Sequence, residues 1–246
     1  EVGVLVEPVA CAVHALRRAG LAPGQRVAVI GAGFMGQVLG LVARAWGAAE
    51  RAVVDRLAGR LAWAAQRWAT LVIDTGPAGA ERAGAGAAGA AAASGRGGAA
   101  AGPADPGQPP AAVPWLAVAS DPEAVARCLE ERWGERADLV LVSPAGEEPL
   151  RLGIACARPG GTVVMFAPTA PGRDPAIPGY DVFFREIRLV PSYSAGPPDT
   201  RAALDLLAAG QVPAGDLVTH RYPLAEVATA YRQVKDPGAL KVMVEL

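Results

Sequence analysis

The chain has 246 residues, of which 52% are hydrophobic, and its formal net charge at pH 7 is −1. This length suits one large α/β domain or one and a half smaller ones, and the apolar fraction supports a buried core. Because acids and bases balance, the composition excludes the basic footprint of a protein that binds nucleic acid or an anionic membrane surface.

The cysteines and the apolar runs indicate a cytoplasmic protein. Cys11, Cys128 and Cys156 are odd in number and form no C-x-x-C pair, which argues against a disulfide framework and favours a reducing compartment. The chain has no run of eighteen apolar residues and no signal-like beginning, so neither a membrane span nor secretion is predicted. It starts with Glu1 rather than Met, and we therefore expect that a segment upstream is absent.

The first predicted elements are a helix and a strand. Pro8 suits the first turn of a helix over about residues 9–19, and Gly20 is placed to end that helix. A turn at residues 21–24 then leads into a short apolar strand over residues 26–30.

A glycine turn follows this strand and carries the clearest functional signal. Its residues are Gly31, Ala32, Gly33, Phe34, Met35 and Gly36. Gly31 allows a tight turn, Gly33 lets backbone N–H groups approach a pyrophosphate, and Gly36 lets helix and strand pack closely. A second strand ends at Asp55, where a carboxylate can accept hydrogen bonds from an adenosine ribose. Together these features predict a dinucleotide-binding βαβ unit, whereas glycines scattered by chance would not come with this periodicity and this acid.

Strands and helices continue to alternate along the rest of the chain. Predicted helices cover about residues 57–68, 122–133, 147–157, 199–209 and 224–234. Predicted strands cover about residues 70–73, 115–118, 138–142, 161–166, 187–190, 217–219 and 240–244. The pattern predicts an α/β fold of the Rossmann type, a doubly wound parallel sheet with helices on both faces.

Residues 76–114 interrupt this alternation. They are almost wholly Ala, Gly, Pro and Ser, and so offer too little large apolar surface to offset the entropy of ordering. We expect a disordered surface insert. An alanine-rich helix across part of the segment and a functional lid are the alternatives.

Six segments, in family order, make the chain resemble the cofactor-binding part of the zinc-containing medium-chain dehydrogenases, which include alcohol, sorbitol and threonine dehydrogenases. The segments are residues 6–10 with 13–17, 23–33, 54–56 with 60–62, 158–164, 219–224 and 238–242. The resemblance implies NAD(P)-linked oxidation of a small-molecule alcohol or polyol, with a catalytic zinc in the full-length enzyme. No nucleic acid or membrane partner is expected.

The resemblance also assigns cofactor-binding residues. The glycine turn matches the pyrophosphate site, and Asp55 matches the ribose-binding acid, which favours NAD over NADP because a carboxylate would repel a 2′-phosphate. Arg56, next in the chain, could instead accept that phosphate. Arg60 and Lys241 also match positions close to the cofactor, although Lys241 could be an ordinary exposed lysine.

Glu7 is the one candidate metal residue. In the polyol-oxidising members a glutamate before this proline lies at or beside the zinc, but a carboxylate here could equally stabilise a helix N-terminus. His14, His220 and Cys11 match no ligand position, and we expect structural roles for them. No catalytic residue is assigned, because the family's first ligand cysteine, histidine-glutamate pair and four-cysteine zinc lobe have no match in this sequence.

The resemblance divides the chain into an interdomain helix region (1–20), a dinucleotide-binding domain (21–196) and a C-terminal segment (197–246) that completes the sheet domain and returns toward the missing catalytic domain. Apolar residues of that segment, including Leu224, Val227, Tyr231 and Val242, would then lose partners. A homo-oligomer, dimer or tetramer, is expected, with strand 187–190 a candidate edge for it. Pro144 departs from the family pattern because it removes a backbone donor that faces the cofactor. A stand-alone or split-subunit nucleotide-binding module and a decayed remnant are the alternative interpretations.

Overall fold

The structure, a computed structural model, describes residues 2–77 and 113–246. The predicted insert at 76–114 therefore lies almost entirely outside the described residues. The helices are α1 (Val2–Ala19), α2 (Phe34–Ala45), α3 (Ala58–Arg67), α5 (Pro122–Trp133), α6 (Glu147–Cys156), α7 (Gly179–Phe184), α8 (Pro197–Ala208), α9 (Ala214–Leu217) and α10 (Val227–Gln233). The strands are β1 (Arg26–Ile30), β2 (Glu50–Asp55), β3 (Leu71–Asp74), β4 (Trp115–Ala117), β5 (Ala137–Val142), β6 (Ala157–Met165), β7 (Arg188–Pro191), β8 (Val218–Pro223) and β9 (Lys241–Glu245).

The first seven strands form one sheet in the order β4-β3-β2-β1-β5-β6-β7, and every neighbouring pair is parallel. The predicted doubly wound α/β fold is confirmed. Strand order reverses between β1 and β5, and in such sheets ligands bind beyond the carboxyl ends of the strands at this switch point. The fold therefore directs attention to the residues that follow β1, β2 and β5.

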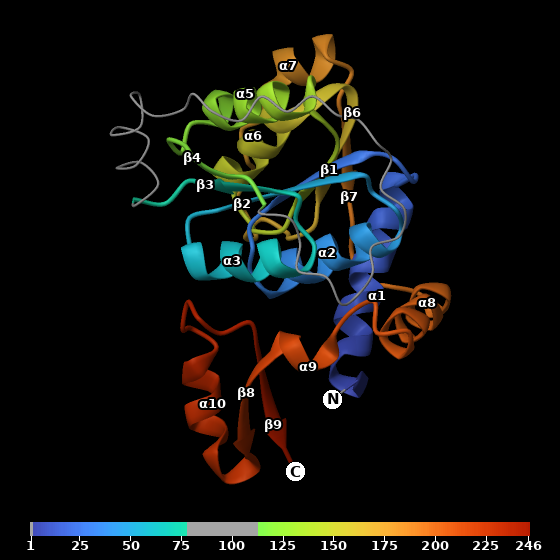
Figure 1. Cartoon of the computed structure of the whole chain (residues 1–246), viewed down its shortest axis with the longest axis vertical. Helices are drawn as coiled ribbons and strands as arrows, with labels where there is room; N and C mark the ends of the chain where they lie inside the picture. Colours follow the sequence, from blue (N-terminus) through green and yellow to red (C-terminus); the bar gives the residue numbers. More distant parts are fainter. Residues whose placement is uncertain (1, 78–112) are drawn as a thin grey trace.

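Alternating side chains of the central strands fill two cores, one on each face of the sheet. Val27 and Val29 of β1 belong to the core shared with α1, α2 and α3, whereas Ala28 and Ile30 belong to the core shared with α5 and α6. Figure 1 shows these two sets of helices on opposite faces. Burial on both faces explains why the strands read as continuous apolar runs rather than as alternating ones.

The first helix differs from the prediction. It begins at Val2 and holds Pro8 in its interior, whereas the sequence predicted a helix over about residues 9–19 with Pro8 in its first turn. Pro8 has no N–H for the carbonyl four residues earlier, but Leu5, Val9 and Leu16 are completely buried along one face of the helix. Burial of that apolar stripe outweighs one lost hydrogen bond. The predicted end is confirmed, since Gly20 follows with a φ of +72°.

The C-terminal region forms a separate small unit at the lower end of the molecule in Figure 1. Strands β8 and β9 pair in parallel in a two-stranded sheet of their own rather than adding to the seven-stranded sheet. The predicted helix at 224–234 is a 3₁₀ turn, Leu224–Glu226, followed by α10. The predicted division of the chain at residues 20 and 196 stays a prediction.

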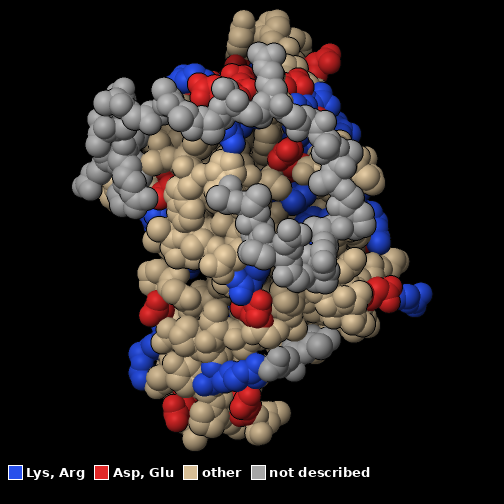
Figure 2. Space-filling view, in the orientation of Figure 1, with Lys and Arg blue, Asp and Glu red and all other residues tan. Residues whose placement is uncertain are grey.

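Two short helices, α7 and α9, were not predicted, because both lie in segments that look like Pro- and Gly-rich loops. On the face shown in Figure 2, basic and acidic side chains are interspersed over the surface, as the near-zero net charge suggests. Among the described residues, none of the helices has the length and apolar character needed to span a bilayer.

Candidate nucleotide-binding site

The glycine turn joins the carboxyl end of β1 to the first residue of α2. Gly31 has a φ of +87°, and its N–H donates to the carbonyl of Val54 on β2 at 2.8 Å. A β-carbon on Gly36 would lie 1.8 Å from the carbonyl oxygen of Gly31, so only glycine allows helix and turn to approach this closely. The structure thus supports the roles predicted for both glycines.

Gly33 caps helix α2 with extended backbone and with no side-chain hydrogen bond to the first turn. The N–H groups of that turn therefore have no capping side chain as a partner. Free N–H groups and the helix dipole together make such an N-terminus attractive to phosphate oxygens.

Asp55, the last residue of β2, contacts the glycine turn directly. Its Oδ2 accepts a hydrogen bond from the Ala32 N–H at 2.6 Å, and its Oδ1 accepts one from the Leu57 N–H at 2.8 Å. Both carboxylate oxygens are thus fixed in direction, and each keeps a lone pair for another donor. The predicted ribose-binding acid and the predicted phosphate turn lie side by side.

Sequence reasoning missed Gln37, which links the glycine turn to α3 through hydrogen bonds. Its side chain is completely buried; Nε2 donates to the carbonyls of Ala32 and Arg60, each at 2.9 Å, and Oε1 accepts from Trp68 Nε1 at 2.7 Å. Trp68 packs so closely on α2 that a β-carbon on Gly40 would lie 2.4 Å from its ring. The one signal in the sequence was a lone amide within a helix that is apolar apart from Arg44.

Two of the three predicted cationic residues, Arg60 and Lys241, lie at the same helix end. Lys241 Nζ is 5.0 Å from the centre of the Phe34 ring, a cation–π geometry at the first residue of α2. A β-carbon on Gly33 would lie 3.6 Å from Arg60 Nη1, while Arg60 Nε donates to the carbonyl of Pro237 at 2.9 Å. Arg56, the third predicted cationic residue, is exposed to solvent. Met35, within the glycine turn, is half-buried.

The carboxyl ends of β5 and β6, beside the glycine turn, enclose only a small hollow. The hollow is lined by Val142, Pro144, Gly146, Leu150, Met165, Ala167 and Thr169, with about 10 Å³ of free volume. That is room for about one water molecule. This hollow, among the described residues, is therefore too small to hold a nicotinamide ring.

Glu7 lies on the exposed side of α1, inside the helix rather than at its N-terminus, so the predicted helix-end alternative is wrong. Its Oε1 accepts a hydrogen bond from Cys11 Sγ at 3.1 Å. Burial, with that hydrogen bond, raises the pKa of the Cys11 thiol to about 12, so the thiol is protonated at neutral pH. Because metals bind the thiolate form of cysteine, the protonated Cys11 thiol is poorly suited to be a metal ligand.

No group of three or more His, Cys, Asp or Glu side chains that could hold a metal occurs within residues 2–77 and 113–246. A zinc site needs about four ligands, so these residues do not fit a zinc by themselves. The role of Glu7 beside a metal stays a prediction.

His14 joins helices. Its Nδ1 is 2.9 Å from Oδ2 of Asp199 on α8, and Arg17 donates to the other oxygen of the same carboxylate. Burial works against the charge of Asp199, but hydrogen bonds from Gly196 N–H and His14 and the charge of Arg17 lower its pKa overall. The histidine ties α1 to α8, which is the structural role expected of it.

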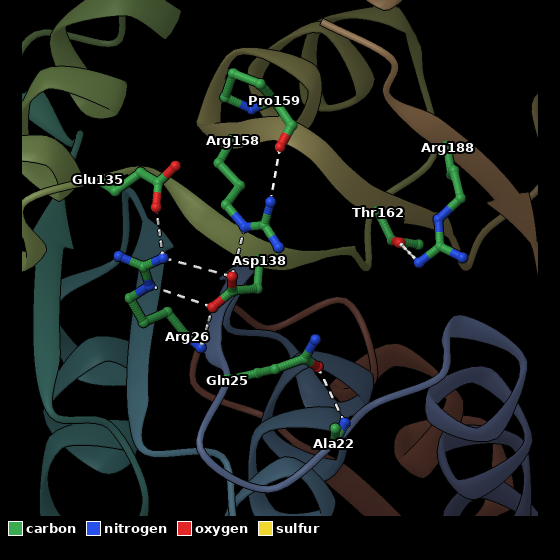
Figure 3. Close-up of polar contacts among 9 residues, drawn as sticks. All are labelled: Ala22, Gln25, Arg26, Glu135, Asp138, Arg158, Pro159, Thr162 and Arg188. Carbon is green, nitrogen blue, oxygen red and sulfur yellow. Dashed lines mark hydrogen bonds and ion pairs between the residues drawn. The ribbon is translucent and has the colours of Figure 1, made fainter.

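The amino edge of the sheet carries a network of paired charges (Figure 3). Asp138 accepts hydrogen bonds from Arg26 Nε at 3.2 Å and from Arg158 Nε at 2.5 Å, and Arg26 Nη2 donates to Glu135 at 2.8 Å. Although burial opposes ionisation, these bonds and one from the Arg26 N–H lower the pKa of Asp138. The network joins β1, β5 and β6 at the edge opposite the glycine turn.

The curated proteins that resemble this chain include sorbitol dehydrogenases and D-xylulose reductases. No protein-family model matches the chain. It is 28% identical over 252 residues to human sorbitol dehydrogenase, which covers all of this chain and 56% of that protein. It is 27% identical over 242 residues to D-xylulose reductase A of Aspergillus oryzae, covering 98% of this chain and 55% of that protein. The chain thus spans little more than half the length of the curated relatives it matches.

Solved structures agree in fold. An oxidoreductase of unknown specificity from Escherichia coli aligns with a TM-score of 0.73 at 23% identity, covering 99% of this chain and 58% of that one. A protein described as a short chain alcohol dehydrogenase from Escherichia coli, complexed with NADH, aligns with a TM-score of 0.67 at 17% identity, covering 97% of this chain and 57% of that one. The chain is therefore related to the zinc-dependent medium-chain dehydrogenases and corresponds to their nucleotide-binding part.

Proposed function

We propose that the chain binds NAD as the cofactor-binding part of an alcohol or polyol dehydrogenase. The observation that carries the proposal is the contact between Asp55 and the glycine turn, where Oδ2 accepts from the Ala32 N–H at 2.6 Å. This contact brings a ribose-binding carboxylate beside the uncapped N-terminus of α2. Arg60 and Lys241 add positive charge at the same place.

Each residue has a defined task in this proposal. The N–H groups at the start of α2 bind the pyrophosphate, and Lys241 and Arg60 offset its negative charge. Asp55 accepts hydrogen bonds from the ribose hydroxyls and would repel a 2′-phosphate, so NAD binds more tightly than NADP. Exposed Arg56 is the residue that could weaken this preference.

A bound NAD would supply a nicotinamide that accepts a hydride from the carbon of a secondary alcohol. The described residues bind and orient the nucleotide, and they do not hold a zinc by themselves. The substrate class, a small alcohol or polyol, is proposed from the names of the relatives. Zinc chemistry is proposed only for a longer protein that would supply further ligands.

Isothermal titration calorimetry of the chain with NAD and with NADP tests the binding proposal. We expect one site and tighter binding of NAD. An Asp55→Gly variant should lose this preference, because the repelling carboxylate is gone. Absence of binding by either nucleotide at millimolar concentration would contradict the proposal.

A second candidate is a nucleotide-binding module, alone or as the subunit of a split enzyme, without dehydrogenase activity. It is favoured by the apolar surface of the C-terminal unit, where Leu224, Tyr231 and Val234 are 55%, 75% and 62% exposed. Both candidates predict nucleotide binding without turnover by the chain alone, so mass spectrometry of the native protein separates the two. A longer native protein that contains a Cys and a His-Glu pair would rule out the module, and a native protein that starts with Met close to Glu1 would favour it.

We also propose a homo-oligomer that forms along β7. This strand is one of the two outermost strands of the sheet, with β6 as its neighbour, and the short helix α7 before it exposes Tyr180, Phe183 and Phe184. Light scattering should give twice the chain mass or a larger multiple, and a Leu189→Pro variant should be monomeric because proline interrupts strand pairing. A monomeric wild-type chain would contradict this.

A further inference from the structure

We infer that the affinity of this chain for the dinucleotide resides in the ADP-ribose part, and that Pro144 withholds a binding pocket from the nicotinamide ring. The inference rests on the proposed function, because it concerns the same edge of the sheet. It assigns to Pro144 a role in ligand specificity.

The glycine-turn side of the edge has formed contacts for an anionic, hydroxyl-bearing ligand. Helix α2 begins without a capping side chain, and Asp55 is held by two backbone N–H groups. Lys241 and Arg60 stand at the same helix end. Pyrophosphate and ribose hydroxyls therefore meet donors, acceptors and positive charge in fixed positions, with little reorganisation on binding.

Pro144 changes the other side of the same edge. A β-carbon on Gly31 would lie 2.7 Å from Pro144 Cγ and 2.9 Å from Cδ, so the ring is packed onto the glycine turn. Proline has no N–H, and the N–H of the preceding Ser143 already donates to the carbonyl of Ile30 at 3.0 Å. The backbone of the two residues directly after β5, Ser143 and Pro144, therefore offers the ligand no free N–H donor.

The hollow beyond Pro144 does not suit a nicotinamide. A carboxamide needs donors and acceptors, yet Val142, Leu150 and Met165 contribute apolar lining, and Thr169 supplies the only side-chain hydroxyl among the lining residues. The free volume is about 10 Å³, far below the roughly 300 Å³ at which ligand pockets begin. To enter this hollow the ring would have to displace lining side chains such as Pro144, and the free energy of that reorganisation opposes binding of the ring.

Calorimetric titrations of the 246-residue chain with NAD, ADP-ribose and nicotinamide mononucleotide test the inference. We expect NAD and ADP-ribose to bind with dissociation constants within about threefold of each other, because the nicotinamide ring finds no formed partner. Nicotinamide mononucleotide should give no measurable heat. NAD binding at least about tenfold tighter than ADP-ribose, a difference of 1.4 kcal/mol, would overturn the inference.

Two substitutions locate the effect at Pro144. Pro144→Gly removes the ring and Pro144→Ala retains a β-carbon, and both restore the N–H. NAD should gain about fivefold over ADP-ribose in Pro144→Gly, the worth of roughly one hydrogen bond, and less in Pro144→Ala. Pro159→Ala, an exposed proline at the opposite edge, is the matched control and should leave the ratio unchanged.

The outcomes separate this inference from the proposed function. If neither NAD nor ADP-ribose binds the wild-type chain, the proposed function fails and the inference fails with it. If both bind but the NAD to ADP-ribose ratio is the same in wild type and Pro144→Ala, with circular dichroism showing both folded, the role assigned to Pro144 is wrong while the proposed function stands.

Discussion

The two edges of the seven-stranded sheet use charged side chains in opposite ways. At the amino edge, Asp138 pairs with Arg26 and Arg158, so these charges neutralise one another. At the carboxyl edge, Asp55 bonds two backbone N–H groups and Lys241 faces the Phe34 ring. Charges paired with each other fix strands in place, whereas charges held by neutral groups can still meet a ligand. Substitutions at the two edges should therefore separate stability from binding.

Gly36→Ala has the largest expected effect. The new β-carbon would overlap the carbonyl oxygen of Gly31, so α2 must move away from the turn. We expect NAD binding to be lost and the free energy of unfolding to fall by about 3 kcal/mol. Calorimetry and urea denaturation measure the two quantities.

Gly59→Ala is the matched control for this change. Gly59 lies on α3 with nothing within 4 Å of an added β-carbon. The substitution should stabilise the chain by about 0.5–1 kcal/mol, because alanine favours helix, and should leave NAD affinity unchanged. Binding by Gly36→Ala at the wild-type level would refute the account of the turn.

Asp138→Asn tests the amino edge. The variant removes the charged partner of Arg158 and one of the two charged partners of Arg26, which keeps Glu135, and should lower the free energy of unfolding by about 2 kcal/mol. NAD affinity should change less than twofold. If the free energy of NAD binding fell by more than the free energy of unfolding, the proposed difference between the two edges would be wrong.

The Asp138 effect should depend on pH. A carboxyl group whose pKa is lowered on folding contributes stability above its unfolded pKa, about 3.9, and loses that contribution as pH falls through the lower folded value. The difference between wild type and Asp138→Asn should thus be complete at pH 7 and shrink below about pH 4. A difference that grows on acidification would contradict the ion-pair account.

Asp55→Asn should weaken NAD binding about tenfold, because a neutral amide is a poorer acceptor for ribose hydroxyls than a carboxylate. Stability should change less than in Asp138→Asn, because Asp55 contacts backbone N–H groups and no buried cation. The NAD titration gives the affinity. An unchanged dissociation constant would remove Asp55 from the site.

Lys241→Ala has the smallest expected effect, a two- to fivefold loss of NAD affinity that decreases as salt is added, because an exposed phosphate contact is screened. Lys235→Ala is the control, since Lys235 is exposed beyond α10. Equal effects of the two substitutions would show that Lys241 acts only through net charge.

The sequence predicted those parts of the fold and site that short-range spacing determines. The strand, glycine turn and Asp55 follow one another at fixed intervals, so their meeting at one edge could be inferred. The Gln37 contacts could not, because its partner Trp68 lies 31 residues away and meets it only when α2 and α3 pack. The start of α1 was missed because burial of Leu5, a tertiary effect, outweighs the local preference of Pro8.

Pro144 shows most clearly what could not be predicted from the sequence. From the sequence it was a missing N–H donor; that its ring packs on Gly31 depends on how β1 and β5 pair, which spacing along the chain does not reveal. The pairing of β8 with β9 in a sheet of their own was equally hidden, since either strand alone could have joined the main sheet.

Hydrogen–deuterium exchange of the chain with and without saturating NAD tests the central claim most directly. We predict slower exchange in peptides that contain Gly31–Gly36 and Asp55–Arg60, and no change in peptides that contain Glu135–Asp138 and Arg158–Thr162. Protection at the amino edge, or no protection at the glycine turn when NAD is bound, would contradict the assignment of the site to the carboxyl edge of the sheet.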